Sequence, residues 1–261
     1  MSSEKNIPIE LSKSQHILRL EDVCFSYAVG IDTVHNVNLN LLPGEFHCLV
    51  GRSGCGKTSL LKLAAGLLSP SSGFVFWQNR TLEAPQFEMG FVFQRPTLLE
   101  WLSVLDNVLL PISLHKKIEP IDLDNAKRLL YLIGLENKTN DKPSELSGGQ
   151  QSRVAIARAL ISTPRILFMD EPFAALDAIT REELQYDLKK ICADNAITVL
   201  FVTHDIGEAV FLGDQVSVMG MGQIHSTLPI KLPHPIHSTT RNSLEFNDIC
   251  SSLRVKMGVS I

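Results

Sequence analysis

The chain has 261 residues, of which 44% are hydrophobic and 20% are charged, and its formal net charge is −4 at pH 7. This is the composition of an ordinary globular protein that is long enough to bury a sizeable core. The slightly acidic balance gives no support to nucleic-acid binding, because proteins of that class present a basic face.

Residues 1–16 are predicted to form a polar leader, since Met1 to Glu10 lacks the apolar run of a secretory signal. No stretch of the sequence approaches the roughly 20 apolar residues that span a bilayer. The five cysteines are scattered and show no C-x-x-C spacing, so neither a disulfide framework nor a zinc site is indicated. We therefore expect a cytosolic chain.

The next segments read as strands that lead into a glycine-rich loop. Ile17 to Phe25 and Val34 to Leu41 alternate apolar and polar residues, as half-buried strands do. After a turn at Pro43-Gly44, the apolar residues Phe46 to Val50 predict a short strand. Gly51 to Thr58 then follows the phosphate-loop pattern G-x-x-x-x-G-K-[ST], and helical apolar spacing resumes behind it.

Beyond this unit the pattern changes twice. Met89 to Phe93 predicts a further strand, and Val104 to Leu135 has mainly helical spacing. The second half alternates strands with helices, at Arg153 to Leu160, Ile166 to Met169, Thr180 to Cys192, Thr198 to Val202, Ile206 to Leu212 and Gln215 to Met219. Such alternation predicts a largely parallel sheet with helices on both faces. The helical residues 95–160 therefore read as an inserted lobe, and residues 226–261 as a short C-terminal extension with a weak helical pattern.

The phosphate loop carries the first candidate site, for ATP. Glycines let successive backbone N–H groups turn toward anionic oxygens, and the helix that follows adds its positive end. Lys57 is predicted to reach the β- and γ-phosphates and the Thr58 hydroxyl to hold Mg²⁺. A glycine-rich turn that binds nothing is the alternative, and the strand before and the helix after the loop argue against it. The expected ATP contacts are Gly51, Arg52, Ser53, Gly54, Cys55, Gly56, Lys57, Thr58 and Ser59.

Polar residues also follow three other predicted strands. Asp170 and Glu171 end an apolar strand, at the strand end where parallel sheets bind ligands. Asp170 is predicted to hold Mg²⁺ directly or through water, and Glu171 to act as general base toward the attacking water. The alternative is an acidic pair that caps a helix, which is less favoured beside a phosphate loop. Gln94 and His204 are placed in the same manner, although neither alone would indicate a site.

Together these segments resemble the nucleotide-binding subunit of ATP-binding cassette (ABC) transporters, over Ile17 to Met221. Tyr27 matches the aromatic residue that stacks on adenine. The other matching motifs are Gln94 (the Q-loop), Leu146, Ser147, Gly148, Gly149 and Gln150 (the signature), Ala175 to Asp177 (the D-loop) and Thr203 to Asp205 (the switch histidine). The signature makes the resemblance specific, because phosphate loops alone also occur in many kinases and GTPases.

The resemblance implies an α/β fold with a phosphate-loop NTPase core, the ABC ATPase domain at residues 17–225. An antiparallel β subdomain would precede this core, and the helical lobe would be inserted in it. Two copies would sandwich two ATP molecules, with the phosphate loop of one facing the signature of the other. Asp177 would link the two sites. The implied catalytic residues are Glu171 and His204, and the implied Mg²⁺ contacts are Thr58, Gln94 and Asp170.

Finer details resemble the importers of nitrate, taurine, alkanesulfonates and pyrimidine precursors. These details are Thr97 to Pro111, Glu171 to Ala178 and Phe201 to Val210. The resemblance implies a separate transmembrane permease, indirectly a solute-binding protein, and a peripheral place on the cytoplasmic face of the inner membrane. The alternatives are an ABC ATPase for lipoprotein release, export or cell division, and an unrelated phosphate-loop kinase, which the signature disfavours.

Two features are left open by the sequence. Ser152 stands where the family usually has a basic residue just after the signature. An apolar cluster follows Gln94, at Leu98, Leu99, Trp101 and Leu102. This cluster either lines a groove for a cytoplasmic helix of the permease or packs in the core of the lobe.

Overall fold

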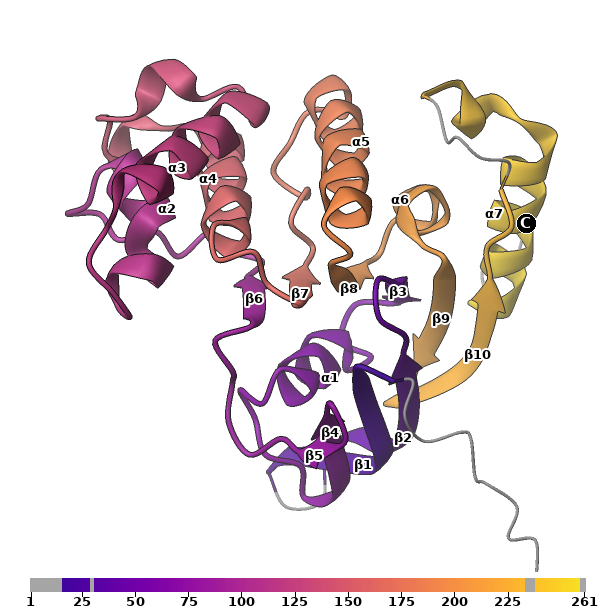
Figure 1. Cartoon of the computed structure of the whole chain (residues 1–261). Coiled ribbons are helices and arrows are strands. Elements are labelled where there is room, and N and C mark those ends of the chain that lie inside the picture. Colours follow the sequence, from indigo (N-terminus) through magenta and orange to yellow (C-terminus); the bar gives the residue numbers. More distant parts are fainter. Residues whose placement is uncertain (1–15, 29–30, 233–237, 259–261) are drawn as a thin grey trace, which may run out of the picture.

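Two β-sheets organise the part of the chain that the structure describes, residues 16–28, 31–232 and 238–258 of a computed structural model (Figure 1). All but the last residue of the predicted leader lies outside those residues. Helix α1 (Lys57–Ala64) contacts strands of both sheets. Among the described residues, no helix is both long enough and apolar enough to span a membrane.

The N-terminal sheet is antiparallel, with the order β2-β1-β4-β5. Its strands are β1 (Leu18–Ala28), β2 (Ile31–Leu41), β4 (Ser72–Trp77) and β5 (Arg80–Thr81). The two strands predicted from alternation are thereby confirmed, whereas β4 and β5 were not predicted. Gly73 in β4 has φ +80, and a Cβ there would lie 2.3 Å from the Asp22 carbonyl oxygen, so only glycine fits against β1.

The central sheet has the order β10-β9-β3-β8-β7-β6. Its strands are β3 (Phe46–Gly51), β6 (Met89–Val92), β7 (Ile166–Asp170), β8 (Thr198–Thr203), β9 (Gln215–Gly220) and β10 (Gln223–Pro229). All of these pair in parallel except β10, which is antiparallel to β9 and was not predicted. Every residue of β3, β7 and β8 is buried, as expected for parallel strands covered on both faces.

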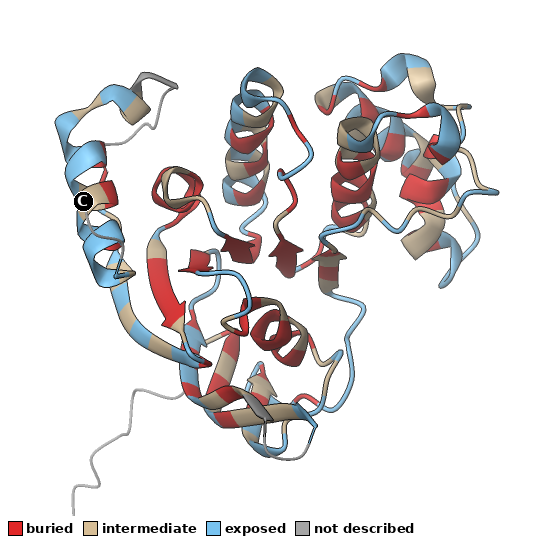
Figure 2. Ribbon diagram, turned by 180° about the vertical axis from the view of Figure 1, so that it is seen from behind, coloured by how far each residue is buried: buried red, intermediate tan, exposed pale blue. Residues whose placement is uncertain are grey.

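Successive residues of these strands enter two different cores. Leu49, Phe168 and Leu200 face α1 and the N-terminal sheet. Their neighbours Cys48, Met169 and Phe201 face the helices on the other side. Figure 2 shows this buried layer running through the central strands and along the inner sides of the helices. The carboxyl ends of β3, β7 and β8 meet at one edge, because the three strands are parallel neighbours.

The inserted helices are α2 (Val104–Ser113), α3 (Pro120–Leu132) and α4 (Gly148–Leu160), with short 3₁₀ turns η1 (Glu136–Lys138) and η2 (Pro143–Glu145). The predicted helical character of Val104 to Leu135 is confirmed. A capping box starts α2, in which the Ser103 hydroxyl accepts from the Asp106 backbone N–H and Asp106 reaches back. These helices pack on one another beside β6 and β7 (Figure 1).

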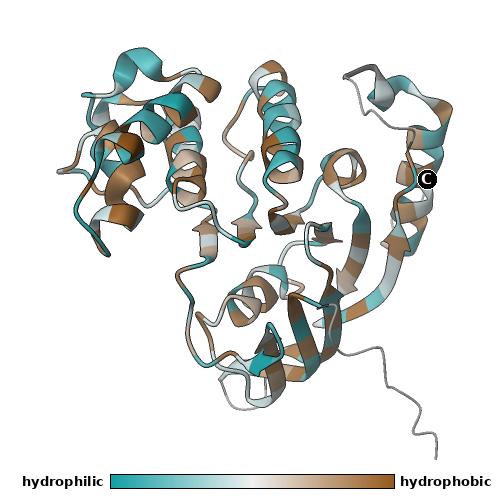
Figure 3. Ribbon diagram, viewed as in Figure 1, coloured by the Kyte–Doolittle hydropathy of each residue, from teal (hydrophilic) through white to brown (hydrophobic). Residues whose placement is uncertain are grey.

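The remaining helices cover the other part of the central sheet. They are α5 (Ala178–Asp194), α6 (Ile206–Leu212), the 3₁₀ turn η3 (Ser238–Asn242) and α7 (Leu244–Lys256). The weak helical pattern in the extension is thus confirmed as α7, which buries Phe246, Cys250 and Leu253. Figure 3 shows much of α5 as hydrophilic. One of its polar residues, Gln185, is buried together with the apolar residues of the helix.

Candidate functional site

The phosphate loop connects β3 to α1 in a conformation that requires its glycines. Gly54 and Gly56 have φ values of 79° and 102°, in the left-handed region that glycine favours. A Cβ at Gly51 would lie 2.2 Å from the Met219 carbonyl oxygen, and one at Gly56 would lie 2.5 Å from that of Thr33. No side chain caps α1 at Gly56. The positive end of this helix is therefore left to an external anion.

Lys57 is buried beneath this loop. Its Nζ donates to the carbonyl oxygens of Gly51, at 2.8 Å, and Arg52, at 3.0 Å. Because carbonyl oxygens of the loop hold the ammonium group, the cation is buried within the loop and does not extend into solvent. Arg52, Ser53 and Gly54 are exposed on the other side. The loop is therefore held by its own hydrogen bonds, while its exposed residues remain accessible to an anion.

Thr58 joins the loop to the end of β7. Its hydroxyl donates to Asp170 Oδ1 at 3.0 Å. Burial raises the pKa of Asp170, and the nearby Glu171 adds to this, while the Thr58 hydrogen bond opposes it. Among the described residues, no group of three or more His, Cys, Asp or Glu side chains is placed to hold a metal. A hydroxyl and a carboxylate do fit Mg²⁺, which takes one or two protein oxygens together with phosphate oxygens.

Glu171 and His204 face each other across the ends of β7 and β8. His204 Nδ1 lies 3.1 Å from Glu171 Oε2. The Glu171 side chain is 17% exposed, whereas that of His204 is 61% exposed. Glu171 has φ 46°, an uncommon backbone conformation for a residue other than glycine. Its N–H donates to the Val202 carbonyl at 3.0 Å, which holds the end of β7 against β8.

Tyr27 lies at the edge of the same loop. Its side chain is 63% exposed, and its hydroxyl accepts a hydrogen bond from Ser59 Oγ at 3.2 Å. The Phe25 ring stands nearly perpendicular to it, at 86° and 4.8 Å between centroids. The structure therefore brings Tyr27, the phosphate loop, Asp170, Glu171 and His204 to one region of the molecule.

Gln94 follows β6, the strand beside β7, and is exposed. The loop behind it is held by Arg158 of α4, which donates to the carbonyl oxygens of Pro96, at 2.8 Å, and Thr97, at 2.9 Å. Burial lowers the pKa of this guanidinium. Arg158 thus connects the segment after Gln94 to α4, the helix that begins at the signature, and no sequence pattern indicates this contact.

The signature opens α4 and is bonded mainly to itself. Ser147 Oγ accepts from the Gln150 N–H, and Gln150 Oε1 accepts from the Ser147 N–H at 2.9 Å. A Cβ at Gly148 would meet nothing within 4 Å, whereas one at Gly149 would lie 3.2 Å from the Ala175 carbonyl oxygen. Within the described residues, no hydrogen bond or ion pair joins the signature to the phosphate loop.

Asp177 and Ser152 extend this second group. Asp177 caps α5 by accepting from the Thr180 N–H at 3.0 Å, and this hydrogen bond lowers the pKa of its carboxyl group. Ser152 is buried, and its hydroxyl donates to the Gly148 carbonyl at 3.1 Å, one turn earlier in α4. A small hydroxyl therefore occupies the position where a basic residue was expected.

The apolar cluster after Gln94 was predicted either to line a groove or to pack in the core, and its residues do both. Leu98 packs against the main core, whereas Trp101 is 72% exposed. Leu99 lines a groove of about 520 Å³, together with Phe87, Met89, Phe91, Phe93, Leu110, Pro111 and Arg158 among others. Buried Asn107 holds this segment by donating to the carbonyl oxygens of Leu99 and Leu102.

A protein-family model described as "ABC transporter" matches residues 34–174. The chain is 42% identical over 209 residues to the aliphatic sulfonates import ATP-binding protein SsuB of Bacillus subtilis, covering 79% of this chain and 81% of SsuB. It is 44% identical over 215 residues to the bicarbonate transport ATP-binding protein CmpD of Synechocystis, covering 80% and 76%. The dimeric, ADP- and Pi-bound structure of the ATP-binding cassette MJ0796 matches with a TM-score of 0.76 at 34% identity, covering 82% of this chain and 99% of that one.

Proposed function

The chain belongs to the ABC transporter family, and we propose that it is the ATP-hydrolysing subunit of an import system that works through a separate membrane permease. The predicted family and α/β fold are confirmed by the sequence match and by the similarity to the MJ0796 cassette. Import is supported by the similarity to SsuB and CmpD. The proposed cargo is a small solute. Sulfonates and bicarbonate are both small oxyanions, which makes oxyanions the first class to screen.

ATP binds at the phosphate loop in this proposal. The N–H groups around Gly54 and Gly56 receive phosphate oxygens, and the buried Lys57 ammonium exchanges its carbonyl partners for the β- and γ-phosphates. The exposed ring of Tyr27 stacks on adenine. Thr58 and Asp170 hold Mg²⁺, with Gln94 as a further contact. When bound, this ion neutralises negative charge on the phosphate oxygens.

Hydrolysis is assigned to Glu171 and His204, and their 3.1 Å contact is the observation that carries the proposal. Glu171 accepts the proton of the attacking water as general base. His204 orients the carboxylate and contacts the γ-phosphate. Both groups lie at the carboxyl edge of parallel strands that also presents Asp170, where sheets of this kind bind ligands.

A second copy of the chain completes the site in this proposal. The signature of one copy meets the γ-phosphate held by the other, with Ser147 and the first turn of α4 pointing the positive helix end at it. The open space at Gly148 leaves room for this approach. The similarity to the MJ0796 cassette, which forms a dimer bound to ADP and Pi, supports the pairing of two copies. Asp177, exposed at the start of α5, is assigned to the contact between the two sites.

The permease docks at the groove beside Gln94. Aromatic residues Phe91 and Phe93 and the aliphatic residue Leu110 line it, which suits the apolar face of a short cytoplasmic helix. Because Arg158 connects the rim of this groove to α4, movement of the docked helix would reach the signature. The chain is therefore proposed to lie peripherally on the cytoplasmic face of the inner membrane, with a solute-binding protein as an indirect partner.

The variant Glu171→Gln tests this assignment. It removes the general base but keeps the side-chain volume, so hydrolysis should fall by about 10²–10⁴-fold while ATP binding is retained. The variant should also accumulate as a dimer with Mg²⁺ and ATP on gel filtration, because the closed state is not turned over. Glu183→Gln, at an exposed carboxylate of α5, is the matched control. Wild-type turnover by Glu171→Gln would remove Glu171 from the mechanism.

Co-purification from membranes tests the transport assignment. The tagged chain should retain a transmembrane permease in mild detergent. Replacing Leu110 and Phe93 by charged residues should release it without affecting the hydrolysis of ATP by the isolated chain. Retention of the permease by that variant would exclude the groove as the docking site.

A further inference from the structure

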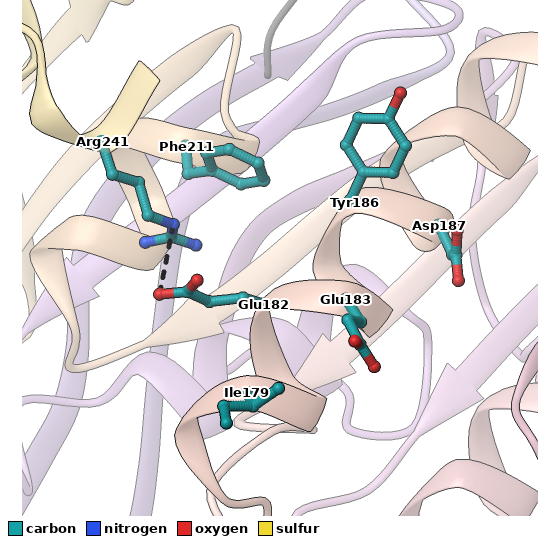
Figure 4. A pocket seen from close by; sticks show the side chains of 7 residues that line it. All are labelled: Ile179, Glu182, Glu183, Tyr186, Asp187, Phe211 and Arg241. Carbon is teal, nitrogen blue, oxygen red and sulfur yellow. Dashed lines mark ion pairs between the residues drawn. The ribbon is translucent and has the colours of Figure 1, made fainter. Parts of the chain in front are cut away.

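Arg241 of η3, in the C-terminal extension, contacts the elements around His204. Its guanidinium carbon lies 4.2 Å from the ring centroid of Phe211 in α6, and its Nε lies 3.9 Å from Glu182 Oε1 in α5 (Figure 4). The side chain is only 19% exposed. A Cβ at Gly207 would be 3.8 Å from Arg241 Nη1, so the guanidinium lies over the first turn of α6, just after the switch histidine.

Arg241 also donates through Nη2 to the side-chain oxygen of Gln185, a residue of α5 with no exposed surface. The Gln185 amide nitrogen in turn donates to Glu208 Oε1 at 3.0 Å. An amide can accept from a cation with its oxygen and donate to a carboxylate with its nitrogen. Gln185 thus connects the extension to α6 inside the protein, where unbonded polar atoms are costly.

Glu208 passes this connection on to both neighbours of His204. Its Oε2 accepts from the Thr203 hydroxyl at 2.6 Å, and its backbone N–H donates to Asp205 Oδ1 at 3.1 Å. Thr203 Oγ1 also accepts from the Asp205 N–H at 3.0 Å, which closes the turn around His204. Glu208 is 6% exposed and Thr203 is 1% exposed, so this part of the network is shielded from water.

His204 lies between these two neighbours. Its side chain is 61% exposed and contacts the Glu171 carboxylate. Its backbone is fixed on both sides by Thr203 and Asp205, and through them by Glu208. We propose that Arg241 is a positioning residue for ATP hydrolysis, acting through Gln185 and Glu208 to hold the His204 imidazole against Glu171. This inference rests on the function proposed above.

If Arg241 served only to anchor the C-terminal extension, its loss would detach α7 from the core. The extension is anchored independently of Arg241, because Phe246 and Leu253 of α7 are buried against the core. Loss of the guanidinium should therefore leave α7 docked and act chiefly on the loop at residues 203–205. The phosphate loop and Tyr27 have no bond to this network among the described residues, so ATP binding should be spared.

The experiment measures ATP hydrolysis by the full-length chain carrying Arg241→Ala, with kcat referred to the folded fraction measured by circular dichroism. We expect kcat to fall about tenfold, as is typical when a contact supporting an active-site group is lost, and KM for ATP to change less than about twofold. Gln185→Met interrupts the network from inside while the extension stays intact, and should have the same effect. Arg254→Ala, at an exposed cation of α7, is the control and should be silent.

The double variant gives the decisive readout. If Arg241 acts through Gln185, then Arg241→Ala should lower kcat no further in the Gln185→Met background. Unchanged kcat in Arg241→Ala, a parallel rise in KM, or multiplying effects in the double variant would each overturn the proposal. If Arg241→Ala does not fold, Gln185→Met alone decides through its kcat and KM. Loss of hydrolysis in Glu171→Gln, measured alongside, shows that the proposed function stands even where this inference fails.

Discussion

The phosphate loop and the signature segment are both glycine-rich, yet the fold holds them in opposite ways. Other parts of the backbone pack against the phosphate loop, so Gly51 and Gly56 lie close to carbonyl oxygens that leave no room for a Cβ. Its lysine is bonded to the carbonyl oxygens of the loop itself. The signature presents exposed Ser147 and Gly148, with open space where a side chain at Gly148 would stand.

This difference separates two uses of glycine. In the phosphate loop, glycine is required by the chain's own backbone, so the requirement exists before any ligand arrives. At Gly148 nothing in the described residues of a single copy requires glycine. A requirement there has to come from a partner, which in the proposed function is the second copy with its bound ATP. In the proposed function, the phosphate loop is therefore a half-site shaped by its own chain, and the signature is a half-site that acts on the second copy.

Replacing Lys57 tests the self-contained half. Lys57→Ala removes a buried cation that faces the phosphate positions, so affinity for ATP should fall about 10²-fold or more. Lys62→Ala, on the same helix but half-buried, should change affinity by less than about threefold. Titration calorimetry with ATP measures both. Equal affinity of Lys57→Ala and wild type would mean that the phosphates bind elsewhere.

A matched pair of alanine substitutions tests the contrast between the two glycines. At Gly51 the new Cβ would meet the Met219 carbonyl oxygen at 2.2 Å, so we expect a loss of about 3 kcal/mol or more in the free energy of unfolding. At Gly148 there is no such clash, and replacing glycine within a helix should leave stability unchanged or raise it by up to about 1 kcal/mol. Urea unfolding of both variants measures the difference. Equal destabilisation would show that the backbone around Gly148 also leaves no room for a side chain.

The sequence predicted the parallel strands of the central sheet because their apolar runs and intervening helices are local signals. It did not predict β4, whose residues Phe74 to Trp77 do not alternate and follow a Ser-Pro-Ser-Ser turn signal. That strand is specified by pairing with β1, far away in the chain. Nor did it predict β10, which is mostly polar and gains its partner only when β9 is in place.

The candidate site divides in a similar manner. The phosphate-loop pattern predicted Lys57, and the end of an apolar strand predicted Asp170 and Glu171. The role of His204 was predicted only from the resemblance to ABC transporters. Spacing could not show that Lys57 is bonded to its own loop, since the rotamer depends on packing. It also gave no indication of Arg241, whose partners come from different helices and meet only in the folded chain.

A smaller effect concerns Asp170 and pH. Because burial raises its pKa in the folded chain, ionised Asp170 destabilises the protein above that pKa, and the penalty disappears as pH falls through it. Asp170→Asn keeps an acceptor for Thr58 and removes the charge. Without ligands at pH 7, its unfolding midpoint should therefore rise by a few degrees, at about 2–4 °C for each kcal/mol. The gain should shrink on acidification toward the unfolded-state pKa near 3.8.

Thermal unfolding of wild type, Asp170→Asn and the exposed control Asp124→Asn checks this dependence. The control should follow wild type at every pH. A lower midpoint for Asp170→Asn at pH 7 would show that the carboxylate stabilises the ligand-free fold. Asp170 would then belong to the structural contacts of the loop as much as to its proposed ion site.

The central claim, that one catalytic site is built from the phosphate loop of one copy and the signature of another, is tested most directly by mixing two inactive variants. Lys57→Ala lacks a working phosphate loop, and Ser147→Arg blocks the signature. In an equal mixture, random pairing makes about half of the dimers mixed, each with one intact composite site. We predict that the mixture hydrolyses ATP well above the sum of the separate variants, and an activity equal to that sum would contradict the account.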